Sequence, residues 1–223
     1  MEQIRKDFDH IAVLSEQEGE PGGTYDRFLL RFVPAGCART LEVGCGTGRF
    51  TRLLARQSDH VTAIDLSGEM IRIARNRSTD YKNIDYSVGD VLGMDLPANQ
   101  FDCIVMIATL HHLPARPVLE KLKQALTPEG VLIIHDLLTP EGALDRAADL
   151  VRLPISVAVR SVRMRRLWAR REVRRAWAEH GKEEQYLTKR EVEDMRDRHL
   201  RGGYVKYHLL WRYTVVWCKQ VAA

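Results

Sequence analysis

The chain has 223 residues, of which 45% are hydrophobic and 29% are charged, and its formal net charge is +4. This composition is typical of a globular protein and excludes a disordered or collagen-like chain. No apolar run approaches the roughly 18 residues that a membrane span needs. The first residues mix both charge signs without a signal-peptide core. We therefore expect a single domain over residues 1–223 in the cytoplasm.

The cysteines are too scattered to predict a metal site or a disulfide framework. The four, none of them in a Cys-x-x-Cys pair, are Cys37, Cys45, Cys103 and Cys218. Clustered spacing is what both kinds of site require. We expect no bound metal and regard these side chains as packing residues.

The region before the first strand predicts two helices, which we expect to form a cap over about residues 1–35. Apolar residues recur with helical spacing from Phe8 to Leu14, and a Gly-rich breaker at 19–23 separates them from a second helical stretch at about 24–32. Tyr25 lies in the second stretch, where a buried structural tyrosine is an equal alternative to a ligand contact.

The segment from Leu41 to Phe50 predicts a strand that turns sharply into a helix. Strand-forming residues lead into three alternating glycines, after which apolar residues return with helical spacing. Glycines permit backbone angles closed to other residues and let a ligand approach the main chain. A dinucleotide fingerprint needs glycine where Arg49 stands. Because the Glu42 carboxylate would repel a pyrophosphate, a cationic ligand fits better.

The series Glu42-x-Gly44-x-Gly46-x-Gly48 resembles the first motif of class I S-adenosylmethionine-dependent methyltransferases. In that family the acidic residue and the glycines border the methionine end of the cofactor. The resemblance therefore implies S-adenosyl-L-methionine as the cofactor. It also assigns the turn to cofactor binding, through Glu42, Gly44, Cys45, Gly46 and Gly48.

The next strand, His60 to Asp65, ends in an acid close to the spacing expected of a nucleotide-binding unit. Asp65 follows Gly44 by roughly the 20 residues that separate the glycine turn from a ribose-binding acid. Ser67 is a plausible N-cap of the following helix. We expect Asp65, together with Leu66 and Met70, to bind the cofactor.

A third strand over 83–88 runs into Gly89 and Asp90. In the resembled methyltransferases an acid at this place faces the adenine amino group, and the next backbone amide meets a ring nitrogen. The resemblance thus assigns Asp90 and Val91 to the adenine. A plain turn is the alternative for Asp90, since Gly-Asp pairs favour turns.

The strongest apolar run, Phe101 to Leu110, predicts a central parallel strand that is covered on both faces. Its carboxyl end should open on the ligand crevice, with Ala108 at the cofactor. The run ends in His111 and His112, as in the small-molecule branch of the resembled family. We expect this pair to contact the acceptor and to include a general base, although packing histidines are more frequent. The segment lacks the Pro-Pro-aromatic signature of base N-methylation.

A helix over 117–126 and a strand over 131–134 follow, and this strand ends in His135 and Asp136, which we assign to the acceptor pocket. Two aromatic and β-branched runs, at 204–209 and 213–218, then predict an antiparallel hairpin. The alternation of strands and helices predicts an α/β fold. We expect a doubly wound, mostly parallel seven-stranded sheet with a C-terminal antiparallel hairpin, the Rossmann-like methyltransferase fold.

An arginine-rich insertion, expected to be helical over about 141–182, interrupts this pattern. The segment from Arg152 to Arg175 contains nine arginines and a single acidic residue, so its net charge is +8. Three interpretations stay open. The segment is a cap whose charges are solvated, a surface for an anionic substrate or nucleic acid, or an amphipathic helix at a membrane surface.

These features predict an S-adenosylmethionine-dependent methyltransferase that acts on a small organic acceptor. The alternatives are an RNA or other nucleic-acid methyltransferase, which is not favoured, and a non-catalytic cofactor-binding protein. The sequence does not predict the acceptor's identity or the oligomeric state. The acceptor contacts that we expect are Tyr25, His111, His112, His135 and Asp136.

Overall fold

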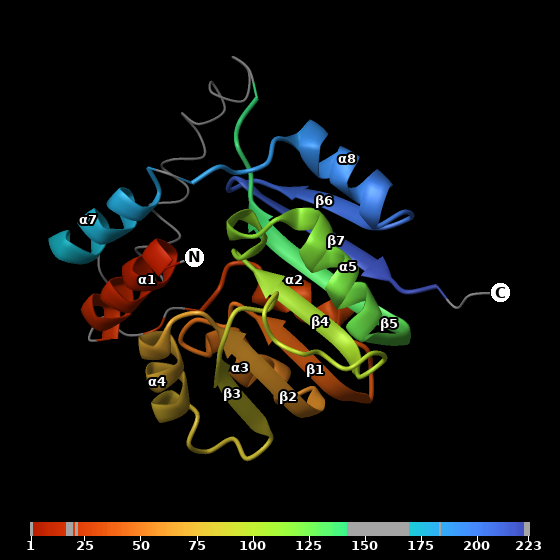
Figure 1. Ribbon diagram of the computed structural model, residues 1–223, viewed down its shortest axis with the longest axis horizontal. Coiled ribbons are helices and arrows are strands. Elements are labelled where there is room, and N and C mark those ends of the chain that lie inside the picture. Colours follow the sequence, from red (N-terminus) through yellow and green to blue (C-terminus); the bar gives the residue numbers. More distant parts are fainter. Residues whose placement is uncertain (1, 17–19, 21, 142–169, 183, 221–223) are drawn as a thin grey trace.

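The computed structural model describes residues 2–16, 20, 22–141, 170–182 and 184–220. Its centre is a seven-stranded sheet with the order β3-β2-β1-β4-β5-β7-β6 (Figure 1). The first five strands run parallel, whereas β7 is antiparallel to both β5 and β6. The strands are β1 (Cys37–Val43), β2 (Ser58–Asp65), β3 (Ile84–Val88), β4 (Phe101–Ile107), β5 (Leu126–Leu137), β6 (Tyr204–His208) and β7 (Arg212–Cys218). The predicted fold class is confirmed.

Helices connect and cover these strands. The α-helices are α1 (Glu2–Ser15), α2 (Asp26–Leu29), α3 (Arg49–Leu54), α4 (Gly68–Arg77), α5 (Ala115–Ala125), α7 (Arg171–His180) and α8 (Lys189–His199). Two short 3-10 helices are η2 (Leu30–Phe32) and η3 (Leu110–His112). Among the described residues, no helix is long and apolar enough to cross a membrane.

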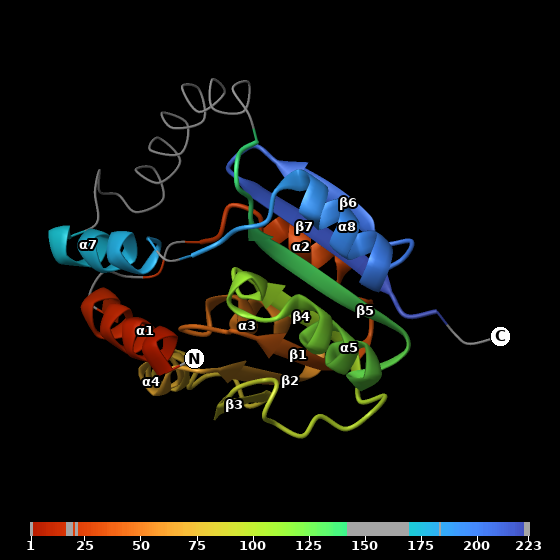
Figure 2. The same ribbon diagram turned by 45° about the horizontal axis from the view of Figure 1, so that its top comes forward.

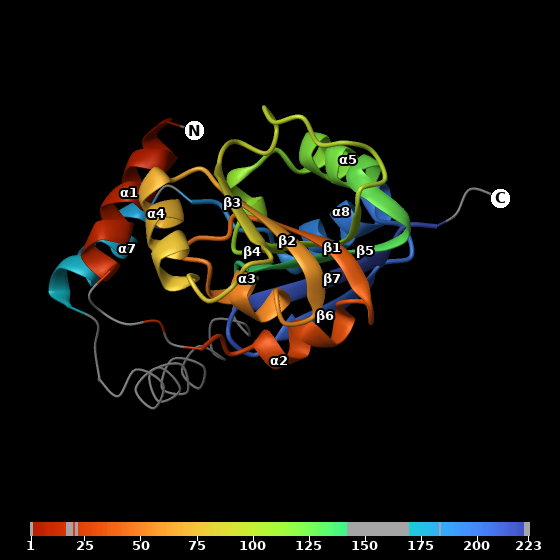
Figure 3. The same cartoon turned by 90° about the horizontal axis from the view of Figure 1, so that it is seen from below.

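The central strands are apolar on both faces because each face carries a helical layer. In β4, Ile104 and Met106 belong to the core shared with α5 and α8. Their neighbours Cys103 and Val105 belong to the core shared with α2 and α3. Successive strand residues point to opposite faces, so the uninterrupted apolar run fits a strand buried on both sides. Figure 3 shows α5 and α2 on opposite sides of the sheet.

A third group of helices lies at one end of the sheet. Helix α1 packs on α4 through Ile11 and Ile73, and α7 lies along α1 (Figure 2). Ser67 caps α4 as predicted, because its hydroxyl accepts a hydrogen bond from the Met70 amide at 3.0 Å. The same hydroxyl donates to Asp9 of α1 at 2.6 Å, which joins the two helices.

Two strand boundaries differ from the predictions. The run from Phe101 was expected to stay extended to Leu110, but β4 ends at Ile107 because Ala108 adopts a positive φ of 51° and the chain enters η3. Strand β5 begins at Leu126 rather than 131, since the turn there stays paired with its neighbours: the Glu129 amide donates to the Lys219 carbonyl.

Most of the arginine-rich insertion lies outside the described residues, which include only residue 141 and residues 170–182 of that stretch. The expected helical structure of residues 142–169, with most of the arginines counted above, therefore concerns residues that the structure does not describe. The described part forms α7, and its exposed arginines flank the buried side chain of Val173.

Candidate active site

A cavity of about 430 Å³ opens at the carboxyl ends of β1, β2 and β4. Ligand crevices of doubly wound sheets lie at this edge. Of the residues predicted to bind the cofactor, all but Gly48 line the cavity: Glu42, Gly44, Cys45, Gly46, Asp65, Leu66, Met70, Asp90, Val91 and Ala108. The motifs thus converge on one space although they are spread over some sixty positions of the chain.

The three glycines of the turn have different surroundings. All adopt a positive φ, of 74° at Gly44, 53° at Gly46 and 75° at Gly48. A Cβ on Gly44 would lie 2.2 Å from the Thr109 hydroxyl, and one on Gly48 would lie 2.3 Å from the Tyr86 hydroxyl. A Cβ on Gly46 would meet no atom within 4 Å. The outer glycines therefore allow the turn to pack against protein, whereas Gly46 keeps its backbone open to the cavity.

Glu42 places a carboxyl group beneath the turn. Its residue surface is 2% exposed, and Thr51 donates a hydrogen bond of 2.5 Å to its Oε2. Burial raises the pKa of Glu42 to about 8, although the hydrogen bond from Thr51 opposes the shift. A cation that entered the cavity would favour ionisation of this group.

Asp65 fastens the turn to the start of α4. Its Oδ2 accepts from the Gly46 amide at 2.8 Å and its Oδ1 accepts from the Ser67 amide at 2.9 Å. Burial raises the pKa of Asp65, and these backbone hydrogen bonds oppose the shift. Each carboxylate oxygen has a further lone pair, so the side chain has acceptor capacity left for a ligand.

Asp90 and Val91 form the wall beyond β3. The Asp90 Oδ1 accepts from the Leu92 amide at 2.9 Å, which is the local turn that was the alternative to a ligand role. Val91 is buried in the core while it also borders the cavity. Both readings of Asp90 thus fit the geometry, because only one of its carboxylate oxygens is used by the turn.

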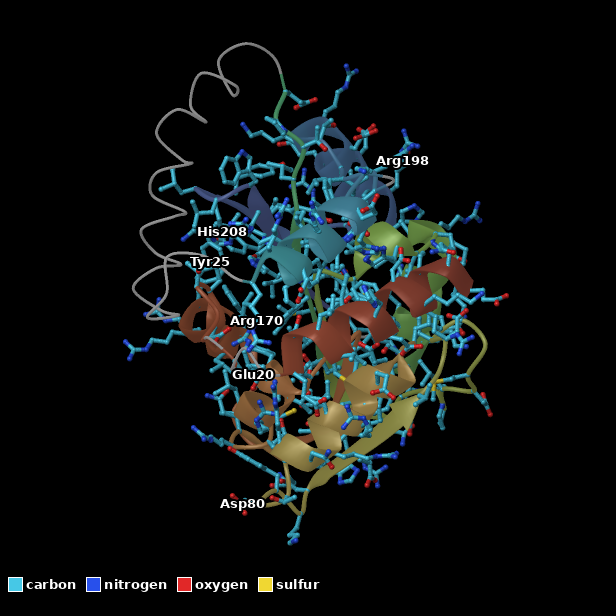
Figure 4. The ribbon with its side chains drawn as sticks, turned by 90° about the vertical axis from the view of Figure 1, so that its left-hand side faces the viewer. Glu20, Tyr25, Asp80, Arg170, Arg198 and His208 are labelled. Carbon is cyan, nitrogen blue, oxygen red and sulfur yellow. The ribbon has the colours of Figure 1, made fainter. Side chains whose placement is uncertain are left out.

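The opposite side of the cavity is closed by α1 and α7. Ile4, Phe8 and Ile11 of α1 and Trp177 of α7 line it. At the rim lies Glu20, which is labelled in Figure 4. It accepts a hydrogen bond from Thr47 of the glycine turn and forms ion pairs with Arg52 and Arg77, the latter at 3.2 Å. The sequence predicted a cap helix where α1 lies and a helical insertion where α7 lies, but it did not assign any of these side chains to the cavity.

The histidine pair divides between two environments. His112 lines the cavity, whereas His111 does not and is held by Asp136, whose Oδ1 lies 2.7 Å from its Nδ1. Burial and the neighbouring charge of His111 lower the pKa of His112 to about 4. For His111, burial lowers the pKa, but hydrogen bonds with Asp136 and Glu184 outweigh it and raise the pKa to about 9.

Two residues that the sequence did not indicate complete this cluster. Glu184 lies 2.9 Å from His111 Nε2 and 3.1 Å from His112 Nδ1, while His180 Nε2 lies 2.7 Å from the same carboxylate. Burial alone would raise the pKa of Glu184, but hydrogen bonds with His111 and Tyr186 outweigh this effect and lower the pKa to about 2. The spacing of His180 and Glu184 by four residues was the only sequence signal, and it is common by chance.

Tyr25 and His135 form a separate aromatic group outside the cavity lining. The centroid of the Tyr25 ring lies 5.0 Å from that of His135 and 4.4 Å from that of His208. Figure 4 shows Tyr25 and His208 next to each other. His135 is hydrogen bonded to Thr214 at 2.8 Å, and burial lowers its pKa to about 3. The structural role that was the alternative for Tyr25 fits this position.

The comparisons with known proteins agree with this geometry. The family model described as a methyltransferase domain matches residues 41–134. This range holds the glycine turn, Asp65, Asp90 and the histidine pair.

Curated relatives match over the same half of the chain. An uncharacterized methyltransferase of Mycobacterium bovis is 36% identical over 117 residues, which cover 52% of this chain and 59% of that protein. A ubiquinone biosynthesis O-methyltransferase of Xylella fastidiosa is 36% identical over 115 residues, which cover 49% of this chain and 46% of that protein. The match therefore spans about half the length of these relatives.

Solved structures match over nearly the whole chain at low identity. Phosphoethanolamine N-methyltransferase 2 of Haemonchus contortus, in complex with phosphomonomethylethanolamine and S-adenosylhomocysteine, has a TM-score of 0.68 at 16% identity, covering 98% of this chain and 60% of that one. A SAM-dependent methyltransferase from Aquifex aeolicus has a TM-score of 0.57 at 20% identity, covering 98% and 97%. The chain therefore has the fold of the class I S-adenosylmethionine-dependent methyltransferases, and its residues 41–134 match the family model of a methyltransferase domain.

Proposed function

We propose that the protein is an S-adenosylmethionine-dependent methyltransferase that acts on a small organic acceptor. The observation that carries the proposal is the single cavity in which the glycine turn, Asp65 and Asp90 meet. These are the groups that the resemblance assigns to the methionine end, the ribose and the adenine. The matched methyltransferase domain supports the same activity.

The residues present fit this cofactor. Gly46 keeps its backbone open to the cavity, so a ligand can approach the main chain there. Asp65 offers acceptor oxygens for vicinal hydroxyls, and Glu42 offers a buried carboxyl that a cation would ionise. When bound, the cofactor supplies an electrophilic methyl group on a sulfonium. The protein's part is to align the acceptor and to exclude water.

A small acceptor is favoured by the way α1 and α7 close the cavity. Apolar side chains from both helices line it opposite the glycine turn, among them Phe8 and Trp177. Polar groups come from His112 on this side and from Thr109, which packs against Gly44 of the turn, and both residues line the cavity. A mostly apolar pocket with few polar groups is typical of small-molecule sites. We retain His112 as the candidate acceptor contact.

Calorimetric titration with S-adenosylmethionine tests the cofactor assignment. Asp65→Ala removes charge-assisted hydrogen bonds and releases the Gly46 amide, so we expect about 100-fold weaker binding with an unchanged circular dichroism spectrum. Asp85→Ala, an exposed carboxylate on the neighbouring strand, is the matched control and should bind normally. Equal affinity of all three proteins would overturn the site.

Transfer of a labelled methyl group to a library of phenols, amines and carboxylates, with RNA included, tests the acceptor class. Transfer to a small molecule supports the proposal. Transfer to RNA alone would support the nucleic-acid alternative instead. Cofactor binding without transfer to any acceptor would favour a non-catalytic cofactor-binding protein.

A further inference from the structure

Three imidazole rings converge on one carboxylate beside the cavity. Glu184 Oε2 lies 2.9 Å from His111 Nε2, and Glu184 Oε1 lies 3.1 Å from His112 Nδ1 and 2.7 Å from His180 Nε2. Among the described residues, His111, His112 and Glu184 are the group whose ligand atoms all lie within 4.8 Å of one another. Their side chains are 5%, 11% and 8% exposed, so they are largely withdrawn from solvent.

The contact between His180 and Glu184 is not a hydrogen bond. Nε2 and Oε1 are 2.7 Å apart, yet both atoms are buried without a hydrogen-bond partner in the described part of the chain. The two side chains are 6% and 8% exposed. Two lone-pair atoms at this distance repel each other unless a positive charge lies between them. A hydrogen bond requires near-linear geometry, whereas a metal ion binds lone pairs that meet at an angle.

The outer nitrogens of two rings are already held by carboxylates. Asp136 lies 2.7 Å from Nδ1 of His111 and also accepts from the His111 backbone amide at 3.0 Å. Asp7 of α1 lies 3.2 Å from Nδ1 of His180. An N–H bonded to a carboxylate fixes the tautomer in which the other ring nitrogen is free to bind a metal. Both Nε2 atoms point toward Glu184, which is the arrangement of a carboxylate–histidine–metal site.

We propose that these groups form a binding site for a divalent transition-metal ion of the zinc class, with the ligands His111, His112, His180 and Glu184. Imidazole nitrogen and carboxylate oxygen are ligands that Zn²⁺ prefers, at about 2.0–2.2 Å in a tetrahedron. Ligand atoms around such an ion are about 3.3 Å apart, so the three separations between Glu184 and the imidazoles need to open by a few tenths of an ångström. The His180 nitrogen is outside the group within 4.8 Å, so the ring must move closer to His111 and His112 to become the fourth ligand.

Four protein ligands make the site structural. Zinc sites that activate a water keep a position open, whereas four-ligand sites are closed. The ligands come from η3 and from the end of α7 and the residues after it, so a bound ion would tie the wall made by α7 to the end of β4. The cysteine spacing did not indicate such a site, because no ligand is a cysteine. The site shares His112 with the proposed acceptor pocket, but metal binding does not require methyl transfer.

Zinc binding to the untagged chain, freed of metal with a chelator, tests the proposal. We expect calorimetry to give one Zn²⁺ per chain, and Co²⁺ to give the strong visible absorption of a tetrahedral site. His180→Ala and Glu184→Ala should weaken binding by about 100-fold or more, and Asp7→Asn by about 10- to 100-fold because it loses only the outer hydrogen bond. His60→Ala is the matched control, a histidine paired with Asp85 on the far strands, and should bind normally.

Two results would overturn the site. One is the absence of stoichiometric Zn²⁺ binding by the unaltered chain at micromolar concentrations. The other is equal binding by the His180→Ala, Glu184→Ala and His60→Ala proteins, which would place the ion elsewhere. In Asp7→Asn one carboxylate oxygen is replaced by an amide nitrogen, which leaves the helix intact. A loss of zinc binding in this variant therefore cannot be attributed to misfolding. A normal cofactor titration of the same variant checks its fold.

Discussion

The two walls of the cavity differ in what determines their shape. On the β1 side, backbone angles set the shape: three glycines with positive φ form the turn, and Asp65 holds it through main-chain amides. On the opposite side, side chains from α1, η3 and α7 set the shape, and His180 meets a partner 173 positions away. The first wall therefore depends on local conformation, whereas the second depends on how distant helices pack.

This difference predicts that the first wall tolerates substitution least. Gly48→Ala combines a φ of 75° with a Cβ 2.3 Å from the Tyr86 hydroxyl, which Ser78 holds at 2.9 Å. Strain and overpacking together should lower the free energy of unfolding by about 3 kcal/mol in urea denaturation. Gly46→Ala has the strain without the clash and should cost about 1 kcal/mol, yet it should weaken cofactor binding. Equal losses of stability would remove the distinction between these glycines.

The buried carboxyl of Glu42 makes the first wall sensitive to pH. Its pKa is raised from 4.5 to about 8. Its contribution to stability is therefore complete below about pH 4.5 and is lost as the pH rises through 8. Glu42→Gln keeps an acceptor for Thr51 but does not titrate. We expect the difference in unfolding free energy between the unaltered protein and Glu42→Gln to change with pH between 5 and 9. The slope should reach about 1.4 kcal/mol per pH unit, and the variant should become relatively more stable as the pH rises. A flat difference would contradict the raised pKa.

Ser67 joins the two walls, because it caps α4 and also contacts Asp9 of α1. Ser67→Ala should cost about 1–2 kcal/mol in denaturant and should weaken cofactor binding as well. Thr188→Ala removes the capping box of α8, away from the cavity, and should cost about 1 kcal/mol with normal cofactor binding. If both variants bind the cofactor equally well, Ser67 acts only as a cap.

The smallest effect on stability is expected in the second wall. Trp177 lines the cavity but is 48% exposed, so Trp177→Ala should change the free energy of unfolding by only about 0.5 kcal/mol. Its effect should appear as a raised KM for the acceptor once one is known. Trp217→Ala, on β7, is the control and should leave that KM unchanged. A large loss of stability in the first variant would show that α7 is needed for folding.

The sequence predicted those parts of the fold that depend on near neighbours. Ser67 as a cap and the glycine turn follow from local chemistry, and the central strand follows from apolar residues that face two helical layers in alternation. The end of β4 was missed because Ala108 adopts a positive φ, which its residue type does not suggest. The start of β5 was missed because the pairing of Glu129 with Lys219 joins distant segments.

In the candidate site, too, the features set by local sequence were predicted and those set by distant packing were not. The predicted cofactor residues lie around one cavity because they are at or just beyond the carboxyl ends of parallel strands, and these ends share an edge of the sheet. Their roles stay predictions. The grouping of His180, Glu184 and Asp7 with the histidine pair could not be predicted, since it arises from the packing of α7 on α1. Tyr25 was predicted as an acceptor contact from its place in the N-terminal cap, and His135 from its place at the end of a strand. In the structure their rings contact each other outside the cavity lining, and their roles stay predictions.

The cysteines offer a route to site-specific labelling without mutagenesis. Cys37, Cys45 and Cys103 are buried, and burial raises the thiol pKa of Cys45 and Cys103 well above the usual value, whereas Cys218 is exposed. Cys218 pairs with Val131 near the amino end of the parallel part of β5, at the edge of the sheet opposite the cavity. A maleimide dye or a surface tether attached at Cys218 would therefore leave the cavity unobstructed.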